Sequence, residues 1–488
     1  MAVAEASPDG RRLLDLGLVD VTRTPGPLCW LAAIGFSGVL LIAAVLSAHA
    51  SGFLVAALLA TISGLFLLRP LAAIVLVIVV HQSVDLWANG QLESIGGLQF
   101  NLTTGLTLLV VLVGGAYVAE RWDAARRAPS VIAFLAFAAI ATVSLVHAPA
   151  LTEAIPEVLR IARIGVLYTL VFVLARSRRD IEVILMAQFA SILPVIGVAI
   201  YQTFTGSDYH APGLGQFQFD RATGGFDGPD ELGIILGVML CAAIPLLFGG
   251  RIRWWPALLV WTALAVTALV GSYTRTGWIS LIAGLLVIGV VRYRSLLVIV
   301  PVALAIVVVA VPSTVQRFND LTNGGESSAE YGNTFGDRLS LWHENLPKVD
   351  RSPVIGNGLD SIDVETGRLP HSDYVRAVVE TGLLGFCAFA ALLLSGLIGA
   401  ARALTRARNE APPGLLTSVC VAGVGISVAY MLISADSNLM TKPVVAGAIW
   451  VFLALAHAAG ELAPDRVAWP VRTHHEIADE IADEAAVA

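Results

Sequence analysis

Four ionisable side chains occur at the start of one long apolar run, in the stretch Leu369–Phe386, "LPHSDYVRAVVETGLLGF". His371 follows a proline, which favours a turning chain, and the serine after it or Asp373 can cap the helix that follows. Arg376 and Glu380 are spaced i,i+4, so they can pair on one face of that helix. Histidine titrates near neutral pH and can act as a general base. The stretch therefore predicts a proton-transfer site; the alternatives are a surface-loop histidine and a structural ion pair at the top of the helix.

Five more arginines lie at or near the ends of apolar runs. Arg160 and Arg163 occur in "PEVLRIARIG", Arg221 in "FDRATGGFDGPDELG", Arg275 in "GSYTRTGW" and Arg338 in "RLSLWHENL". Guanidinium groups match phosphate oxygens in bidentate fashion and stay charged at any relevant pH. Several of them converging would form a binding site for a polyanion, whereas a single one can simply anchor lipid headgroups.

The composition indicates what must position these residues. Apolar residues make up 57% of the 488 and charged ones 14%, and the mean hydropathy is +0.78. Soluble proteins usually carry about a quarter charged residues and no apolar runs of 18 or more. The sequence therefore predicts an all-α polytopic membrane protein with about 14 transmembrane helices and no cleaved signal peptide. The expected spans are 27–48, 51–68, 70–88, 101–120, 129–147, 157–175, 181–203, 231–249, 256–272, 276–291, 295–312, 377–400, 414–434 and 443–460.

The positive charges predict the orientation. With the N-terminus in the cytoplasm, 19 of the 30 Lys and Arg residues fall on the inner side, and every short inner loop is basic. Residues 1–26 are then a cytoplasmic segment, 27–460 a transmembrane domain, and 461–488 a cytoplasmic acidic tail. Two outer loops exceed a turn, 203–231 and 313–376, and we expect short helices in the second.

This topology narrows the chemistry to the outer face of a plasma membrane. Nucleotides and nucleotide sugars are cytoplasmic, no nucleotide-binding glycine motif follows a strand, and nothing favours a nucleic-acid partner. A phosphate carrier at the outer face is a polyprenyl-pyrophosphate glycan, whose pyrophosphate leaves as charge develops on it. We therefore expect this donor, a glycan or lipid-anchored acceptor and membrane lipid as partners, and no metal or cofactor.

Three quoted segments resemble the O-antigen ligase and O-antigen polymerase family of bacterial membrane glycosyltransferases. "SYTRTGWISLIAGLLV" resembles its Ser-Arg-small segment opening a span, and "GDRLSLWHENLPKVDRSPVIGNGLDS" its Arg-x-x-x-Trp stretch followed by Pro-x-x-Gly-x-Gly. "PHSDYVRAVVETGLLGF" resembles its His-Asn-x-Tyr/Leu…Glu-x-Gly-x-x-Gly closure. With the looser "RATGGFDGPDELGIILGVM", the resemblance covers about 221–386. Ser372 stands where the family often has Asn, and Thr274 where it often has Ser; both keep a hydrogen-bonding side chain.

The resemblance implies an inverting, metal-independent transfer of a glycan from polyprenyl pyrophosphate to an acceptor hydroxyl, as in cell-envelope polysaccharide biosynthesis. It implies that His371 is the base and that Arg221, Arg275 and Arg338 bind the donor pyrophosphate. We expect the site to be supported by Asp373, which could orient the His371 ring, and by Arg376, Glu380, Arg160 and Arg163.

Two rival functions are weighed against this one. A multi-span transporter or flippase would carry ionisable residues near mid-span, where only His81 and Asp85 lie, whereas the arginines collect at one face. A metal-dependent polyprenyl-sugar transferase would carry carboxylates in its first outer loop, where the chain has only "SAHAS" (47–51). The acceptor stays open between another lipid-linked glycan (a polymerase), a cell-wall or lipid anchor (a ligase) and a protein, because no motif identifies it.

Overall fold

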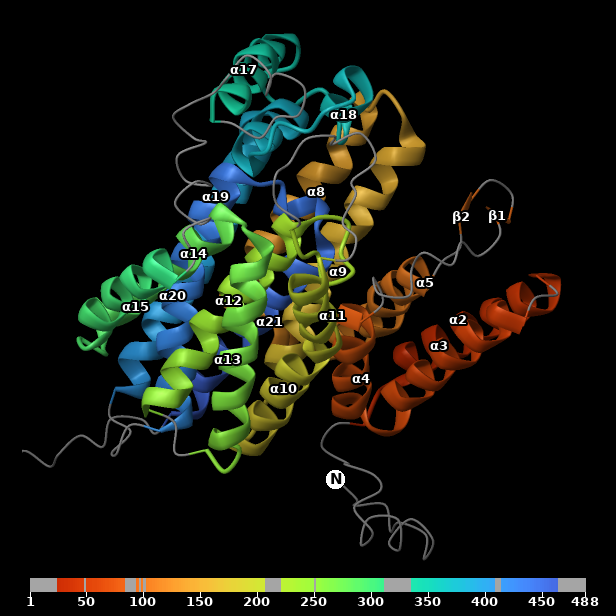
Figure 1. The fold of residues 1–488 in the computed structure, drawn as a ribbon. Helices are drawn as coiled ribbons and strands as arrows, with labels where there is room; N and C mark the ends of the chain where they lie inside the picture. Colours follow the sequence, from red (N-terminus) through yellow and green to blue (C-terminus); the bar gives the residue numbers. More distant parts are fainter. Residues whose placement is uncertain are drawn as a thin grey trace, which may run out of the picture.

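The computed structural model describes residues 24–47, 50–83, 94–95, 98–99, 102–206, 221–249, 252–310, 335–408 and 414–463. Helices dominate these residues (Figure 1), and the strands β1 (Ser94–Ile95) and β2 (Leu98–Gln99) form one two-residue antiparallel pair. The expected segments 1–26 and 461–488 lie almost wholly outside the described residues, as do 207–220 of the first outer loop and 311–334 of the second.

The helices before the first long loop are α2 (Pro27–Ser47), α3 (Ala50–Leu68), α4 (Pro70–Ser83), α5 (Leu102–Leu109), the π-helical η3 (Val110–Gly114), α6 (Gly115–Glu120), α7 (Trp122–Ala125), α8 (Val131–Ser144), η4 (Leu145–His147), α9 (Leu151–Leu174), α10 (Arg178–Ser191) and α11 (Leu193–Thr205). Those after it are α12 (Pro229–Gly249), α13 (Trp255–Ser272), α14 (Arg275–Val291), α15 (Leu296–Ala310), α17 (Phe335–Asn345), η6 (Leu346–Arg351), α18 (Ser361–Thr366), α19 (Asp373–Ala407), α20 (Leu415–Asp436), η7 (Leu439–Thr441) and α21 (Pro443–Leu462).

Seven helices among the described residues are long and apolar enough to cross a membrane. They are Leu102–Glu120, Arg178–Thr205, Pro229–Gly249, Trp255–Ser272, Asp373–Ala407, Leu415–Asp436 and Pro443–Leu462. Shorter apolar helices of 10–17 residues occupy several of the other expected spans, among them Pro70–Ser83 and Arg275–Val291. The all-helical membrane fold is therefore confirmed, and the count of fourteen spans is not. α9 is in neither group, because it carries several charged side chains in its first half.

The centre of the bundle is α21. In its membrane-length stretch 94% of the residues are buried, and in that of the neighbouring α20 83% are. A helix that is apolar on every side has to be surrounded by other helices, and α21 packs against α9, α19 and α20. α2 and α3 pair as a hairpin on one flank (Figure 1), where α2 exposes large apolar side chains such as Leu31 and Ile34.

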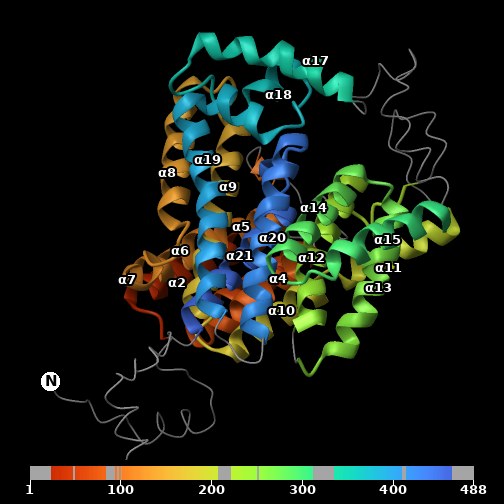
Figure 2. The same ribbon diagram turned by 90° about the vertical axis from the view of Figure 1, so that its left-hand side faces the viewer.

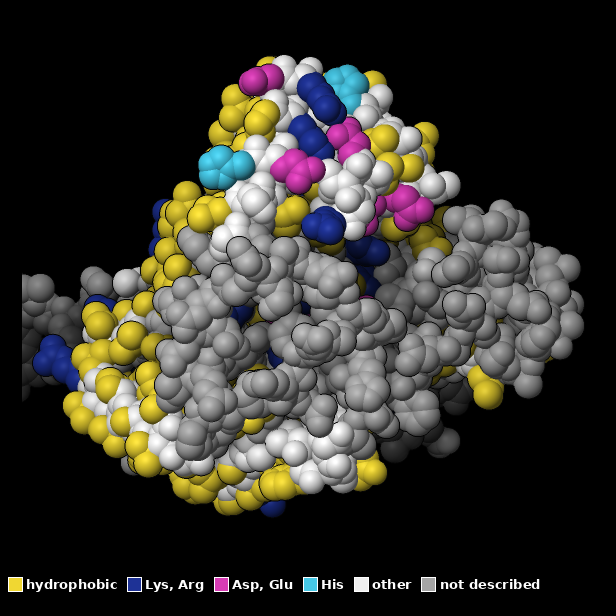
Figure 3. All heavy atoms as spheres, turned by 45° about the horizontal axis from the view of Figure 1, so that its top comes forward, with side chains coloured by type: hydrophobic (Ala, Val, Ile, Leu, Met, Phe, Trp, Pro, Cys, Tyr) yellow, Lys and Arg dark blue, Asp and Glu magenta, His cyan; other side chains and the backbone are white. Residues whose placement is uncertain are grey.

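Short helices cover one end of the bundle. α17 lies across this end, next to η6 and α18 (Figure 2), as expected for the described part of the segment 313–376. Seen from above this end, basic, acidic and histidine side chains gather over the cap, while hydrophobic side chains cover the flank below it (Figure 3). The starts of α12, α14, α19 and α21 and the end of α20 meet beneath the cap, so this end collects the chemistry-bearing residues.

Candidate active site

A cavity of about 550 Å³ lies between α14, α17 and α20. Its lining combines the charged side chains of Arg275, Arg338 and Asp436 with apolar ones, including Ile279 and Leu432. The last two are 48% and 45% exposed, so the apolar wall continues onto the outside of the bundle. The cavity can therefore accept a ligand with an anionic head and an apolar tail.

Arg338 is held at this cavity by the last residue of α20. Its guanidinium pairs with the carboxylate of Asp436 and donates to the backbone oxygen of the same residue at 3.0 Å. The hydroxyl of Thr276 donates to the other Asp436 oxygen at 2.7 Å. Among the described residues the buried Nε of Arg338 has no hydrogen-bond partner. A buried donor of this kind is costly unless something binds it.

The start of α14 brings Arg275 to the same cavity. Gly233 and Gly237 on α12 let the two helix backbones touch, because a Cβ at Gly277 would lie 2.5 Å from the Gly233 carbonyl oxygen and one at Gly237 2.7 Å from the Gly277 oxygen. Small residues four apart allow this close approach. Arg275 and Thr276, the first two residues of α14, line the cavity, so it lies at the positive end of the helix dipole, which favours anions.

Arg221 lies on the other side of this helix start. Its guanidinium donates to the carboxylate of Asp230 at 3.0 Å, to the Thr274 hydroxyl at 3.2 Å and to the Ser272 backbone oxygen at 3.1 Å. Arg221 therefore ties the loop before α12 to the α13–α14 junction. It does not line the cavity with Arg275 and Arg338, although Thr274, its partner, directly precedes Arg275.

His371 does not itself line the cavity, but the residue before it, Pro370, contacts a lining residue. The indole N–H of Trp342, a lining residue, donates to the Pro370 backbone oxygen at 2.8 Å. The φ of His371 is +49°, a left-handed conformation that costs a non-glycine residue about 1–2 kcal/mol. The only other described non-glycine residues with positive φ, Tyr273 and Asp360, also lie at this end of the bundle. Such outliers persist where the surroundings enforce them, and they concentrate at functional sites.

The surroundings of His371 keep its ring neutral. Burial lowers the pKa of the imidazole, and the positive charges of Arg338 and Lys442 lower it further against the opposing charge of Asp230. A neutral imidazole at neutral pH can accept a proton, as a general base must.

The prediction that Asp373 orients this ring is wrong. The Asp373 carboxylate is fully buried, and its two oxygens accept from the backbone N–H groups of Leu439 and Met440 at 3.1 and 3.2 Å. It therefore fastens the turn between α20 and α21 to the start of α19. The carboxylate whose charge acts on His371 is that of Asp230.

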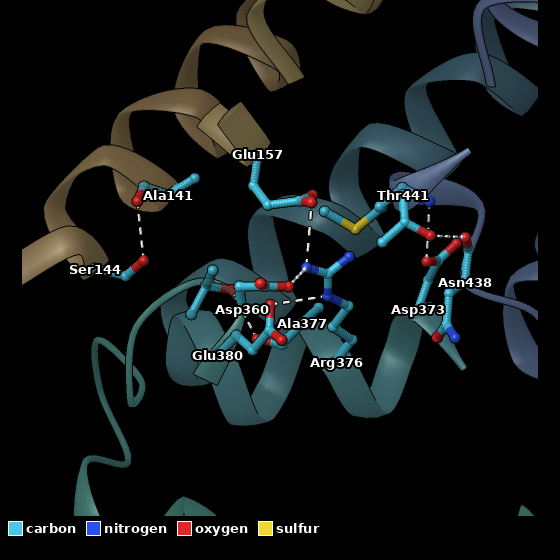
Figure 4. Close-up of polar contacts among 12 residues, drawn as sticks. Ala141, Ser144, Glu157, Asp360, Asp373, Arg376, Ala377, Glu380, Asn438 and Thr441 are labelled. Carbon is cyan, nitrogen blue, oxygen red and sulfur yellow. Dashed lines mark hydrogen bonds and ion pairs between the residues drawn. The ribbon is translucent and has the colours of Figure 1, made fainter. Parts of the chain in front are cut away.

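Arg376 is the centre of a second, buried charge cluster (Figure 4). Its Nε donates to Glu380 at 2.9 Å, which confirms the i,i+4 pair, and its Nη2 lies 3.2 Å from Asp360 and 3.5 Å from Glu157. Arg376 and Glu380 are each 1% exposed, and Arg160 pairs with the far oxygen of Glu157. The cluster joins α9, α18 and α19 beneath the cap.

Arg163 lies elsewhere. It is 3% exposed and donates to the Thr107 hydroxyl at 3.1 Å, beside a small cavity that His81 and Gln188 also line. The two arginines are three residues apart, so they lie about one turn apart along α9, where Arg163 contacts Thr107 of α5 instead of the cap. Only Arg160 reaches the cluster under the cap.

The glycine-rich loop 353–358 inserts into a break in α19. At Gly382 the helix has φ +69°, and beyond the break the Leu383 N–H donates to the Pro353 oxygen at 2.8 Å. Before the break the Glu380 oxygen accepts from the Gly358 N–H at 3.0 Å. The backbone groups that the break leaves open are thus satisfied by the loop. The two glycine motifs noted in the sequence therefore fit each other, and they fix the helix that begins next to His371.

Three charged residues of the site escaped the sequence analysis: Asp230, Asp436 and Lys442. Each stands between apolar runs, in "DGPDELG" or "ISADSNLMTKP". Like the arginines, each is an ionisable residue at the end of an apolar run, and this signal could have identified all three. Within the described residues no three His, Cys, Asp or Glu side chains gather as metal ligands.

Residues 258–390 match the sequence model of the O-antigen ligase family. The chain carries an O-antigen ligase domain. The matched range holds Arg275, Arg338, His371, the Arg376–Glu380 pair and the break in α19, whereas the α20 side of the cavity, with Leu432 and Asp436, lies beyond it. Arg221 precedes the range. A search of curated proteins finds no match to the chain. This domain match and the apolar helices support a membrane protein of polysaccharide biosynthesis, and the matched family suggests glycosyl transfer from a lipid-linked glycan.

Proposed function

We propose that the O-antigen ligase domain transfers a glycan from a polyprenyl-pyrophosphate donor to an acceptor hydroxyl at the outer face of the plasma membrane. The transfer proceeds with inversion and without a metal. The observation that carries the proposal is the convergence of Arg275, Arg338 and the start of α14 on one cavity whose wall continues as apolar surface.

The shape of the cavity supports a donor that is charged at one end and apolar at the other. The pyrophosphate would bind Arg275, Arg338 and the first N–H groups of α14. The polyprenyl chain would leave along Ile279 and Leu432, whose side chains are about half exposed. A soluble nucleotide sugar would gain nothing from this apolar exit.

The charge balance also favours an anion. The charged side chains that line the cavity are the two arginines, Arg275 and Arg338, and one carboxylate, Asp436, so one positive charge is left over. Preorganised cations of this kind stabilise the negative charge that develops on a departing pyrophosphate.

His371 would supply the proton transfer. Its neutral ring accepts the proton of the acceptor hydroxyl as the oxygen forms a bond to the anomeric carbon. The bond from that carbon to the pyrophosphate breaks on the opposite side, which inverts the configuration. A positioned base of this kind contributes roughly 10²–10⁴-fold.

The outer-face location follows from the charge distribution of the sequence. It puts the α17–α18 cap outside, and the arginine-rich end of α19, with Arg402, Arg406 and Arg408, inside. The donor and the acceptor would then meet on the side where envelope polysaccharides are assembled.

The test uses purified full-length protein, a polyprenyl-pyrophosphate glycan and candidate acceptors, with the new glycosidic bond detected by mass spectrometry. We expect His371→Ala to lower the rate at least about a hundredfold, within the range for a lost general base, while donor binding persists. His343 is the control: it is exposed on α17 and its ring bonds its own helix at the Leu339 oxygen. Movement of the intact glycan across vesicles without a new bond would replace this proposal with the transporter alternative. A near wild-type rate in His371→Ala would remove the catalytic assignment.

A further inference from the structure

We propose that Trp342 and Asn438 are positioning residues that hold the backbone of His371 from both sides and so aim its ring at the acceptor. The inference rests on the proposed function of His371 as the base and adds how the fold sets its direction. Neither residue is assigned a role by the family match or by the charge analysis.

The restraint before His371 comes from α17. The Trp342 indole has a single N–H, and it donates to the Pro370 oxygen at 2.8 Å. This oxygen belongs to the peptide bond that joins Pro370 to His371, so the hydrogen bond restrains the orientation of that peptide. The proline ring removes a further degree of freedom, since its own φ is locked.

The restraint after His371 comes from the turn beyond α20. The next peptide N–H, that of Ser372, donates to the side-chain oxygen of Asn438 at 3.0 Å. Asn438 is 4% exposed, and its turn is fastened to α19 by the carboxylate of Asp373. The Ser372 side chain also caps α19 at the Val375 N–H.

Because both flanking peptides are restrained, the φ and ψ of His371 are restrained too. The two hydrogen bonds therefore stabilise the left-handed φ of +49°, which a histidine does not favour by itself. In the ordinary right-handed or extended region the Cβ would point in another direction. The ring direction therefore depends on two hydrogen bonds made by other residues, although neither touches the ring.

The same geometry couples the base to the donor site. Arg338 and Trp342 are four residues apart on α17, so they lie on one face of it, and both line the cavity. A single short helix thus holds the guanidinium that would bind the pyrophosphate and the indole that restrains His371. A donor that draws Arg338 inward would carry His371 with it.

The test compares Trp342→Phe and Asn438→Leu, which remove the hydrogen bonds and keep most of the volume. We expect kcat to fall about ten- to a hundredfold, because a misplacement of about 1 Å can cost 10²-fold, while KM for the donor changes less than about threefold. Asn438→Asp retains an acceptor oxygen and should recover most of the rate. Trp255→Phe is the matched control, since it also loses an indole N–H bonded to a backbone oxygen, that of Leu247, and we expect a normal kcat.

A second readout does not depend on glycosyl transfer. Diethyl pyrocarbonate modifies accessible neutral imidazoles, and mass spectrometry reports the rate at each histidine. We expect His371 to react several-fold faster in Trp342→Phe and Asn438→Leu, with His343 unchanged.

If neither the labelling rate nor kcat changes, the positioning role is overturned. If donor KM rises in step with the loss of kcat, the residues serve donor binding instead, which also overturns it. Absence of transfer by the wild-type protein with the labelling change intact would overturn the proposed function alone.

Discussion

The guanidinium of Arg376 and the carboxylate of Glu380 lie 2.9 Å apart, and each side chain is 1% exposed. Glu157 and Asp360 approach the same guanidinium from α9 and from the start of α18. A buried ion pair adds little compared with apolar packing, but removing one partner leaves an uncompensated charge. The cluster is therefore a structural joint, which fits the structural alternative for this pair better than a direct role in chemistry.

We expect Arg376→Ala to destabilise the protein by about 3–5 kcal/mol, as for other broken buried pairs. The thermal unfolding midpoint and the yield of folded protein in detergent measure this. The control is Arg351→Ala, because Arg351 also pairs with a carboxylate, that of Glu365, but is 60% exposed; exposed pairs contribute about 0–1 kcal/mol. Equal unfolding midpoints for the two variants would contradict the claim that the Arg376 cluster stabilises the packing of α9, α18 and α19.

The break in α19 should not tolerate a side chain. A Cβ at Gly382 would lie 2.4 Å from the Val354 backbone, and its φ of +69° is unfavourable as well. Gly382→Ala should therefore displace the loop 353–358 and abolish activity with a large loss of stability. Gly367→Ala separates the two causes, because Gly367 has a similar φ of +66° but open space around it, and should cost only about 1–2 kcal/mol. A Gly382→Ala protein as stable as Gly367→Ala would refute the steric argument.

Local features of this region were predictable from the sequence. The Ser372 cap and the Arg376–Glu380 pair depend only on spacing within one helix, and both are present. The short helices of the cap followed from polar and apolar residues alternating at helical spacing. The prediction that Asp373 orients the His371 ring did not hold. A carboxylate two residues from a histidine can instead accept from backbone N–H groups of a distant turn, here the one between α20 and α21.

The tertiary partners could not be predicted. Nothing in the sequence shows that Glu157 meets Arg376, or that Asp436 meets Arg338. Such pairs depend on which helices pack together, and hydropathy carries no information on this. The number of spans is not confirmed for a related reason: hydropathy marks apolar runs, but helices shorter than a bilayer's thickness can give the same signal.

Geometry as well as charge should matter at the donor site. We expect Arg275→Lys and Arg338→Lys to lose nearly as much donor affinity as the alanine variants, because an ammonium cannot replace a bidentate fork. Binding of a radiolabelled polyprenyl-pyrophosphate glycan to purified protein measures this. Arg402→Lys, at the exposed far end of α19, provides the control. Full binding in both lysine variants would favour lipid-headgroup anchoring instead.

The orientation can be tested on whole cells. Val364→Cys, 45% exposed on α18, should react with a membrane-impermeant thiol reagent, and Thr405→Cys, exposed near the end of α19, should not. The background should carry Cys387→Ser, since Cys387 is the exposed one of the four cysteines. Labelling at Thr405 and not at Val364 would invert the proposed topology.

The pH dependence of the rate should report the charges around His371. The ring acts as a base only when neutral, so the rate falls as the pH drops through its pKa. Burial, Arg338 and Lys442 lower this pKa below the ordinary 6.5, so the wild-type rate should stay constant to below pH 6.5 before it falls.

Lys442→Gln removes one of the positive charges that lower the His371 pKa, so the acid limb should move to higher pH. Asp230→Asn removes the negative charge that raises the His371 pKa, so the acid limb should move to lower pH. The maximal rate can change as well, because Asp230 also pairs with Arg221. Rates at saturating donor from about pH 5 to 8 measure both shifts, and His343→Gln should leave the profile unchanged. If the acid limbs of Lys442→Gln and Asp230→Asn coincide with that of the His343→Gln control, another group, and not His371, controls the reaction.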